Sequence, residues 1–144
     1  MSCKKLKLFI DASVFIAASA SKEGGSAALF KIYLKAPFTP VTTQVVLNES
    51  ELNIKAKLGE ETLLSFYKLI TQIPLVLLPT PTLTERMKYR DIIHQKDAHV
   101  LAAALLGNCD CLITLDRKHF ITTKIHQAKL PIKILTPGDF LKSL

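Results

Sequence analysis

The residues whose type and placement could do chemistry are four carboxylates: Asp11, Glu49, Asp97 and Asp116. Each stands beside apolar sequence, where a carboxylate is costly unless it is paired or binds a cation. Carboxylates brought to one place also repel one another until a cation neutralises them. Hard oxygen ligands of this kind suit Mg²⁺ or Mn²⁺, so the four residues predict a divalent-metal site.

Two of these acids directly follow predicted buried strands. Asp11 comes after residues 6–10, and Asp116 comes after residues 112–115. Because the carboxyl ends of parallel strands meet at one edge of a sheet, we expect the two side chains to emerge together. An alternative for each residue alone is that it caps the turn or helix after its strand.

The other two acids lie on predicted helices. Asp97 is near the start of an Ala/Leu-rich helix at residues 95–106, which should face the same sheet edge, although Asp also favours a first helical turn. Glu49 has a rival in Glu51, which is about 200° further round the helix. We favour Glu49 because it shares a predicted inner face with apolar residues, namely Val45, Val46, Leu52 and Ala56.

Alternating strands and helices must position these residues. Strands are predicted at residues 6–10, 76–78, 111–115 and 133–135, with an extended segment at 37–41. Helices are predicted from residue 13 and at 26–35, 43–58, 60–73, 82–90 and 95–106, with a last one from Pro137. This order predicts an α/β fold with three α/β/α layers around a central, mostly parallel sheet.

Composition bounds the kind of protein. The chain has 144 residues, of which 49% are hydrophobic, so we expect one domain spanning residues 1–144. Its formal net charge of +7 favours a polyanionic partner such as nucleic acid. Residues 1–20 superficially resemble a signal peptide, but Asp11 interrupts the apolar run, so we predict a cytoplasmic protein with no membrane association.

The cysteines are Cys3, Cys109 and Cys111, and their odd number indicates no disulfide framework. Cys109 and Cys111 could form a metal pair, but no second Cys or His pair stands at zinc-like spacing. We therefore interpret them as buried structural cysteines.

Four stretches in order resemble the signature stretches of PIN-domain nucleases, including the VapC-like toxin ribonucleases. They are Phe9-Ile-Asp-Ala-Ser-Val-Phe-Ile-Ala, Val46-Leu-Asn-Glu, Lys96-Asp-Ala-His-Val-Leu-Ala-Ala-Ala and Leu112-Ile-Thr-Leu-Asp-Arg-Lys-His-Phe. The closing Ile134-Leu-Thr-Pro-Gly-Asp-Phe-Leu is similar to the family's last strand and helix. The resemblance covers essentially the whole chain, and it is the order of the stretches that is specific.

The resemblance implies a metal-dependent endoribonuclease that leaves 5′-phosphate and 3′-hydroxyl ends. Asp11, Glu49, Asp97 and Asp116 match the family's acidic positions, and one or two Mg²⁺ or Mn²⁺ ions would activate a water there. Asp11 and Asp97 are the expected direct ligands. Asp116 and Glu49 are expected to bind metal directly or through water.

Further residues are expected around the acids. Ser13 and Thr114 match the family's polar helpers and would orient ligands or a phosphate. Arg117, Lys118 and His119 follow the last acid and are candidates for RNA phosphate contacts, the alternative being a solvated charged turn.

Three nearby residues carry separate expectations. Leu115 stands where many family members have Gly, so it could crowd the backbone of that loop. Asp110 precedes its strand and should lie at the opposite end of the sheet. His99, two positions past Asp97, is expected to point away from the site.

Other functions remain open at this stage. The resemblance is compatible with the toxin of a toxin–antitoxin pair, blocked by an antitoxin protein, and equally with a stand-alone RNA-processing enzyme. A non-catalytic RNA-binding or scaffold PIN domain is the alternative, although such domains usually lose acids. A phosphatase-like domain is disfavoured because Asp11-Ala-Ser13 lacks a second acid. A homodimer is expected by resemblance.

Overall fold

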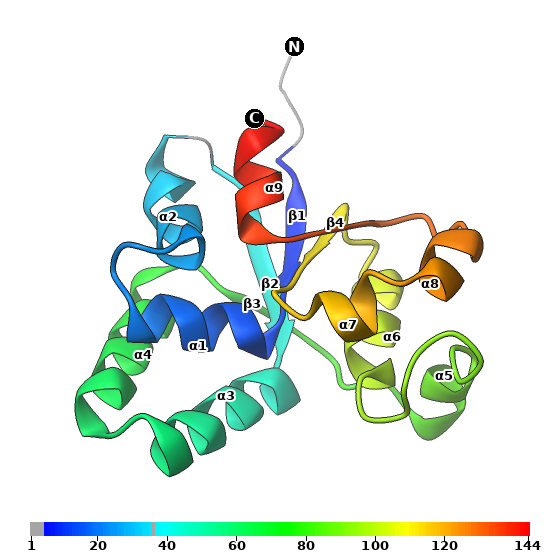
Figure 1. Ribbon diagram of the computed structural model, residues 1–144, viewed down its shortest axis with the longest axis horizontal. Helices are drawn as coiled ribbons and strands as arrows, with labels where there is room; N and C mark the ends of the chain where they lie inside the picture. Colours follow the sequence, from blue (N-terminus) through cyan, green and yellow to red (C-terminus); the bar gives the residue numbers. More distant parts are fainter. Residues whose placement is uncertain (1–4, 36) are drawn as a thin grey trace.

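A parallel sheet forms the centre of the protein, as seen in a computed structural model that describes residues 5–35 and 37–144 (Figure 1). Its strand order is β3-β2-β1-β4-β5, and every pairing between neighbours is parallel. The strands are β1 (Lys7–Ile10), β2 (Thr39–Thr43), β3 (Val76–Leu78), β4 (Cys111–Ile113) and β5 (Lys133–Leu135). The predicted three-layer α/β/α architecture with a parallel sheet is confirmed.

Helices follow the strands along the whole described chain. They are α1 (Ala12–Ala20), α2 (Gly25–Lys31), the 3-10 helix η1 (Ile32–Leu34), α3 (Gln44–Lys57), α4 (Glu60–Gln72), α5 (Leu83–Met87), α6 (Ala98–Leu106), α7 (Arg117–Phe120), α8 (Thr123–Gln127) and α9 (Pro137–Lys142). In Figure 1, α1, α2 and α4 lie on one side of the sheet, and α5 and α6 lie on the other. Helix α9 returns to pack against α2.

The strand order explains this division of the helices. The chain runs from β1 through β2 to β3 at one edge, then crosses the sheet to β4 and β5. Parallel crossovers are right-handed, so reversing the direction of travel moves the connecting helices to the opposite face. The reversal occurs between β1 and β4, and ligands bind outside the carboxyl ends of the strands at such a point.

Local sequence signals set the ends of several helices. The Thr43 hydroxyl accepts the Val46 N–H at 3.2 Å to cap α3. Thr82 and Glu85 form a reciprocal capping box at the start of α5. Gly59, at φ +88°, occupies the left-handed backbone conformation needed between α3 and α4.

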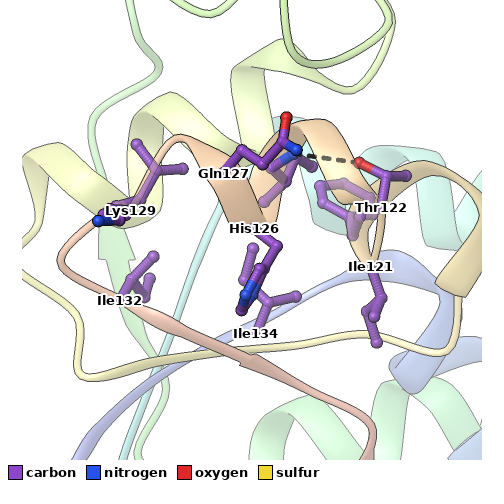
Figure 2. Close-up of a pocket in the computed structure, with 10 residues that line it drawn as sticks. Ile121, Thr122, His126, Gln127, Lys129, Ile132 and Ile134 are labelled. Atoms are coloured by element: carbon purple, nitrogen blue, oxygen red, sulfur yellow. Dashed lines mark hydrogen bonds between the residues drawn. The ribbon is translucent and has the colours of Figure 1, made fainter.

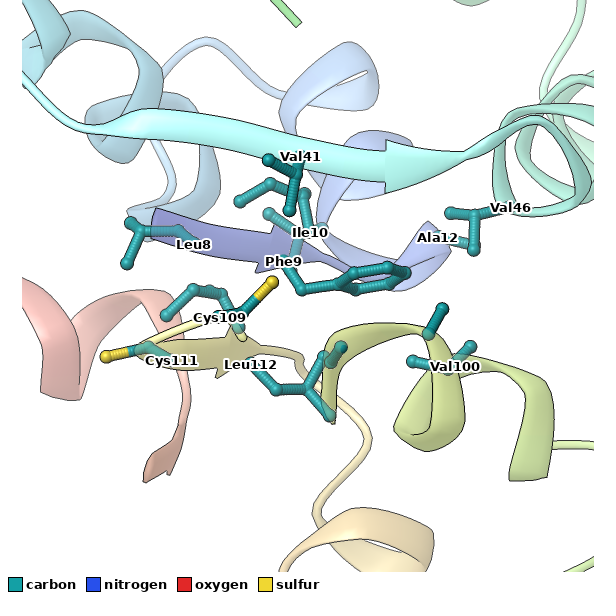
Figure 3. Close-up of a cluster of buried hydrophobic side chains, with 14 of the residues drawn as sticks. Leu8, Phe9, Ile10, Ala12, Val41, Val46, Val100, Cys109, Cys111 and Leu112 are labelled. Carbon is teal, nitrogen blue, oxygen red and sulfur yellow. The ribbon is translucent and has the colours of Figure 1, made fainter. Parts of the chain in front are cut away.

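The central strands are buried on both faces, as parallel strands usually are. Leu8, Phe9 and Ile10 of β1 are fully buried and belong to the core drawn in Figure 3. Cys109 and Cys111 are buried free thiols in the same cluster, which confirms their interpretation as structural cysteines. Burial raises the pKa of the Cys109 thiol to about 11. Cys3 lies outside the described residues.

The predicted inner face of α3 is correct at Val46 and wrong at Leu52 and Ala56, which are exposed. Its buried residues are Val46, Leu47, Ser50 and Ile54, whereas Leu52 is 66% exposed. The inner face contains a serine, which the apolar pattern did not count, and its hydroxyl is satisfied by donating to the Val46 carbonyl at 2.8 Å. In α4, Phe66 is buried, whereas Leu64, two residues earlier, is 61% exposed.

Boundaries near the carboxyl edge also differ from the prediction. Helix α6 begins at Ala98 rather than at residue 95, and β4 ends at Ile113, two residues early. The charged segment after Asp116 forms α7, and α8 follows it, although neither helix was predicted. No helix in residues 5–35 and 37–144 has the length and apolar character needed to cross a bilayer.

The burial difference within α4 predicts a contrast between two truncations. Phe66 is 1% exposed, so Phe66→Ala should lower the free energy of unfolding by about 3–5 kcal/mol through lost apolar contact and the cavity left behind. Leu64→Ala in the same helix should change it by less than about 0.5 kcal/mol. Urea denaturation of both variants checks this, and equal losses would contradict the observed helix face.

Candidate metal site

Asp11 joins the two central strands at their carboxyl ends. Its backbone N–H donates to the Ile113 carbonyl at 3.1 Å, and its side chain is buried. The Oδ2 atom accepts hydrogen bonds from Thr114 Oγ1 at 2.7 Å and from Ser13 Oγ at 2.9 Å. The structure thus brings together Asp11 and both predicted helper hydroxyls.

The direction of these hydrogen bonds is set by the loop after β4. Thr114 Oγ1 accepts the Asp116 N–H and Ser13 Oγ accepts the Leu115 N–H, both at 3.0 Å. Each hydroxyl has one hydrogen, which is then left to donate to Asp11. The two hydroxyls therefore hold one oxygen of Asp11 and, through their acceptor sides, the loop that carries Asp116.

Asp116 and His119 are linked at the first turn of α7. Asp116 Oδ1 accepts the His119 N–H at 3.2 Å, so Asp116 caps this helix as well as facing the site. Asp116 Oδ2 lies 2.7 Å from His119 Nδ1. Both predicted roles of Asp116, as cap and as edge carboxylate, are compatible in this geometry.

Asp97 completes a group that could hold a metal ion. It precedes α6, and its Oδ2 lies 4.0 Å from His119 Nδ1. One ligand atom from each of Asp97, Asp116 and His119 lies within 4.8 Å of the others. Carboxylate oxygens and an imidazole nitrogen are ligands that divalent cations accept, so this donor set fits a bound metal.

The two acids with perturbed pKa values belong to this site. Burial raises the pKa of Asp11, and the Asp97 carboxylate raises it further, while the Thr114 and Ser13 hydroxyls oppose the rise. Burial also raises the pKa of Asp97, with a contribution from Asp116, while His119 and His94 oppose it. Neighbouring carboxylates with shifted pKa values are typical of functional sites. A bound cation would offset both the cost of burying their charges and the repulsion between them.

Glu49 lies apart from the three-residue group and contacts a histidine. Its side chain is 45% exposed, and its Oε1 lies 3.0 Å from Nε2 of His99. His99 was expected to point away from the site, but its buried ring reaches from α6 to Glu49 of α3, one of the four predicted acids. A buried histidine beside a predicted acid could not be recognised from a helix that is otherwise Ala and Leu.

Glu51, the rival of Glu49, faces a different helix. The Tyr67 hydroxyl of α4 donates to Glu51 Oε2 at 2.7 Å, and Lys55 lies 3.6 Å from Oε1. Glu51 therefore belongs to the packing between α3 and α4. Of the two glutamates, Glu49 is the one that contacts α6, through His99.

The residues around the last acid differ in their surroundings. Arg117 and Lys118 are exposed, and Arg117 lies 3.9 Å from Asp139. Leu115 is exposed and does not have a positive φ, so it does not crowd the loop as a replacement for Gly. Asp110 accepts the Lys7 N–H at 2.7 Å at the start of β1, which places it at the opposite end of the sheet, as expected.

A pocket of about 560 Å³ lies elsewhere, between α8 and β5 (Figure 2). Ile121, His126, Ile132 and Ile134 lie on its wall, and none of the four acids lines it. The candidate metal site is therefore marked by its convergent polar groups and not by a large cavity.

Comparisons with known proteins agree with this fold. Residues 7–118 match the PIN domain. No curated protein matches the chain in sequence. Among solved structures, PAE2754 from Pyrobaculum aerophilum superposes with a TM-score of 0.64 at 16% identity, over 95% of this chain and 88% of that one.

Two further solved structures are similar. VapC20 from Mycobacterium tuberculosis, described as a sarcin-ricin loop cleaving toxin, gives a TM-score of 0.57 at 14% identity, over 85% of this chain and 95% of that one. VapBC2 from Rickettsia felis, bound to a DNA fragment from its promoter, gives a TM-score of 0.63 at 14% identity, over 90% of this chain and 97% of that one. At these identities the likeness is one of fold.

The buried charge of Asp11 predicts a pH-dependent cost in metal-free protein. The pKa of Asp11 is higher in the folded protein than the ordinary value of 3.8. The contribution of Asp11 to the free energy of unfolding is therefore fully present below pH 3.8, where the carboxyl is protonated in both states. It is lost as pH rises through the folded-state pKa, because the folded protein must then hold a buried charge. Asp11→Asn removes this loss, so in chelator the variant should be more stable than the wild type near neutral pH, and the difference should shrink on acidification.

The measurement is the free energy of unfolding from urea denaturation between about pH 4 and about pH 8. Asp91→Asn, which neutralises an exposed carboxylate, serves as the control and should change stability by less than about 0.5 kcal/mol. A difference between Asp11→Asn and wild type that is independent of pH would contradict the assignment.

Proposed function

Because the chain belongs to the PIN-domain family, we propose that it is a divalent-metal-dependent endoribonuclease that cleaves RNA phosphodiester bonds with a metal-activated water. The observation that carries the proposal is the convergence of Asp97, Asp116 and His119 at the carboxyl edge, beside the buried Asp11. These groups come from three separate parts of the chain. They meet at the carboxyl edge of the sheet, where α/β proteins bind ligands.

The acids have distinct tasks in this proposal. Asp11, Asp97 and Asp116 hold Mg²⁺ or Mn²⁺, with Glu49 contributing directly or through a water. A bound ion of this kind would lower the pKa of a water and stabilise charge on the leaving oxygen. Ser13 and Thr114 hold Asp11 by its Oδ2 atom, which keeps the carboxylate in one orientation.

The basic side chains beside the site suit an RNA substrate. Arg117 and Lys118 are exposed on α7, immediately after Asp116. Side chains of this type contact phosphate oxygens and position a nucleic acid without reading its sequence. Together with the net charge of +7, they support RNA as the substrate, cut to leave 5′-phosphate and 3′-hydroxyl ends.

The likeness to VapC20 and to VapBC2 supports a toxin role within this function. The chain would then be the toxin of a toxin–antitoxin pair, acting in the cytoplasm as a homodimer of single-domain subunits and held inactive by an antitoxin protein. The alternative is a non-catalytic RNA-binding or scaffold PIN domain. The presence of all four acids favours the enzyme.

Metal-dependent digestion of a mixed RNA pool tests the proposed activity. Loss of a residue that only supports a metal ligand typically costs roughly 10–100-fold in activity. Asp97 is proposed as a ligand itself, so Asp97→Asn should reduce Mn²⁺-dependent cleavage by more than this. Asp110→Asn is the matched control, because it neutralises a carboxylate at the opposite end of the sheet and keeps an oxygen that can accept the Lys7 N–H. Equal activity of the two variants would remove the catalytic assignment.

The two neighbouring glutamates provide a second test. Glu49→Gln should lower the cleavage rate by about tenfold or more, because it removes a carboxylate charge that lies against His99 of α6 and that this proposal assigns to the metal. Glu51→Gln should leave the rate unchanged, since Glu51 packs against Tyr67 of α4. Initial rates at saturating Mn²⁺ compare the pair, and a larger loss in Glu51→Gln would reverse the assignment.

A further inference from the structure

His119 differs from the two basic residues that precede it. All three side chains are exposed, and Arg117 lies 3.9 Å from Asp139 of α9. The His119 ring instead faces the acids, with Nδ1 at 2.7 Å from Asp116 Oδ2 and at 4.0 Å from Asp97 Oδ2. Its imidazole therefore belongs with the carboxylates and not with the basic rim.

The backbone that carries this imidazole is held by its own helix. The His119 N–H is bound to Asp116 Oδ1, and the next residue, Phe120, is buried in the core. The backbone at residue 119 is thus held from both sides. The ring itself is oriented by the contact of Nδ1 with Asp116 Oδ2 at 2.7 Å, so it loses less conformational entropy when it binds a ligand beside that carboxylate.

The distances suit coordination of one cation. With metal–ligand bonds of about 2.1 Å in octahedral geometry, neighbouring ligand atoms stand about 3.0 Å apart and opposite ones about 4.2 Å apart. The two distances from His119 Nδ1 to the carboxylates, 2.7 and 4.0 Å, are close to these values. Only small side-chain adjustments would be needed to bring the three atoms around an ion.

We propose that His119 is itself a metal ligand through Nδ1, and that its nitrogen makes the site select a first-row transition cation such as Mn²⁺ over Mg²⁺. This inference rests on the proposed function. Mg²⁺ is bound in proteins almost entirely by oxygen and keeps several waters, whereas first-row transition cations accept imidazole and carboxylate together. Replacing one oxygen by an imidazole therefore weakens Mg²⁺ binding relative to Mn²⁺.

Two other roles for His119 give different outcomes. As a helix-cap partner of Asp116, it would affect stability and leave metal binding unchanged. As an RNA phosphate contact, it would affect RNA binding and leave metal binding unchanged. If His119 is a metal ligand, its removal lowers the affinity for Mn²⁺ in the absence of RNA. It also removes a nitrogen from the atoms that coordinate the ion.

The test uses Mn²⁺ and Mg²⁺ alone with the full-length protein. Pulsed electron paramagnetic resonance of bound Mn²⁺ detects a directly coordinated ¹⁴N, and calorimetric titration measures affinity for each ion. We expect the ¹⁴N signal in the wild type and its loss in His119→Ala, with Mn²⁺ affinity reduced by about tenfold or more and Mg²⁺ affinity changed much less. His126→Ala, which removes an exposed imidazole in α8, is the matched control and should behave as wild type.

The outcomes separate this inference from the proposed function. Mn²⁺ bound with oxygen ligands only, or a ¹⁴N signal that persists in His119→Ala, overturns the role of His119 and leaves the nuclease proposal standing. A wild type that binds neither ion overturns both. If His119→Ala is poorly folded, His119→Gln keeps the side-chain bulk without an imidazole, and the same loss of the ¹⁴N signal is expected.

Discussion

The buried carboxylate of Asp11 is the constraint on which the rest of the site depends. It stands at the end of β1, the central strand, and its Oδ2 is held by Ser13 from α1 and Thr114 from the end of β4. The same two hydroxyls accept the backbone N–H groups of Leu115 and Asp116. Through them the loop carrying Asp116 is attached to Asp11, and α7 with His119 begins from that loop. A change at Asp11 would therefore reach several groups of the site through hydrogen bonds.

In the absence of a cation, the buried carboxylate of Asp11 lowers the stability of the folded protein. Burial and the charge of Asp97 both raise the pKa of Asp11, and burial and Asp116 raise that of Asp97. Leu8, Phe9 and Ile10 of β1 are fully buried apolar side chains, so the stability lost at the site is offset by packing on both faces of the sheet. Such local conflict is common where a protein keeps groups for binding and catalysis.

The sequence predicted best those features that leave a local signal. β3 and β5 were placed at their observed bounds, because short apolar runs are visible within a few positions. The helix starts were predicted at Thr42 or Thr43, at Thr82 or Thr84 and at Thr136-Pro137, and the observed caps are Thr43, Thr82 and Thr136. The four-residue helix α7 was missed because it is too short to show a 3.6-residue period. The inner face of α3 was misplaced because Ser50 occupies it, satisfied by a bond to its own helix.

Contacts between distant elements could not be predicted in the same way. His99 sits in an apolar helix, and only the fold shows that its ring meets Glu49. Its other nitrogen, Nδ1, is buried without a hydrogen-bond partner within the part of the chain that the structure describes. Leaving a buried polar atom unsatisfied costs about 1–3 kcal/mol, a penalty that an apolar residue at this position would avoid. The two histidines thus contact different acids: the buried His99 lies against Glu49, the most exposed of the four, and the exposed His119 lies against Asp116.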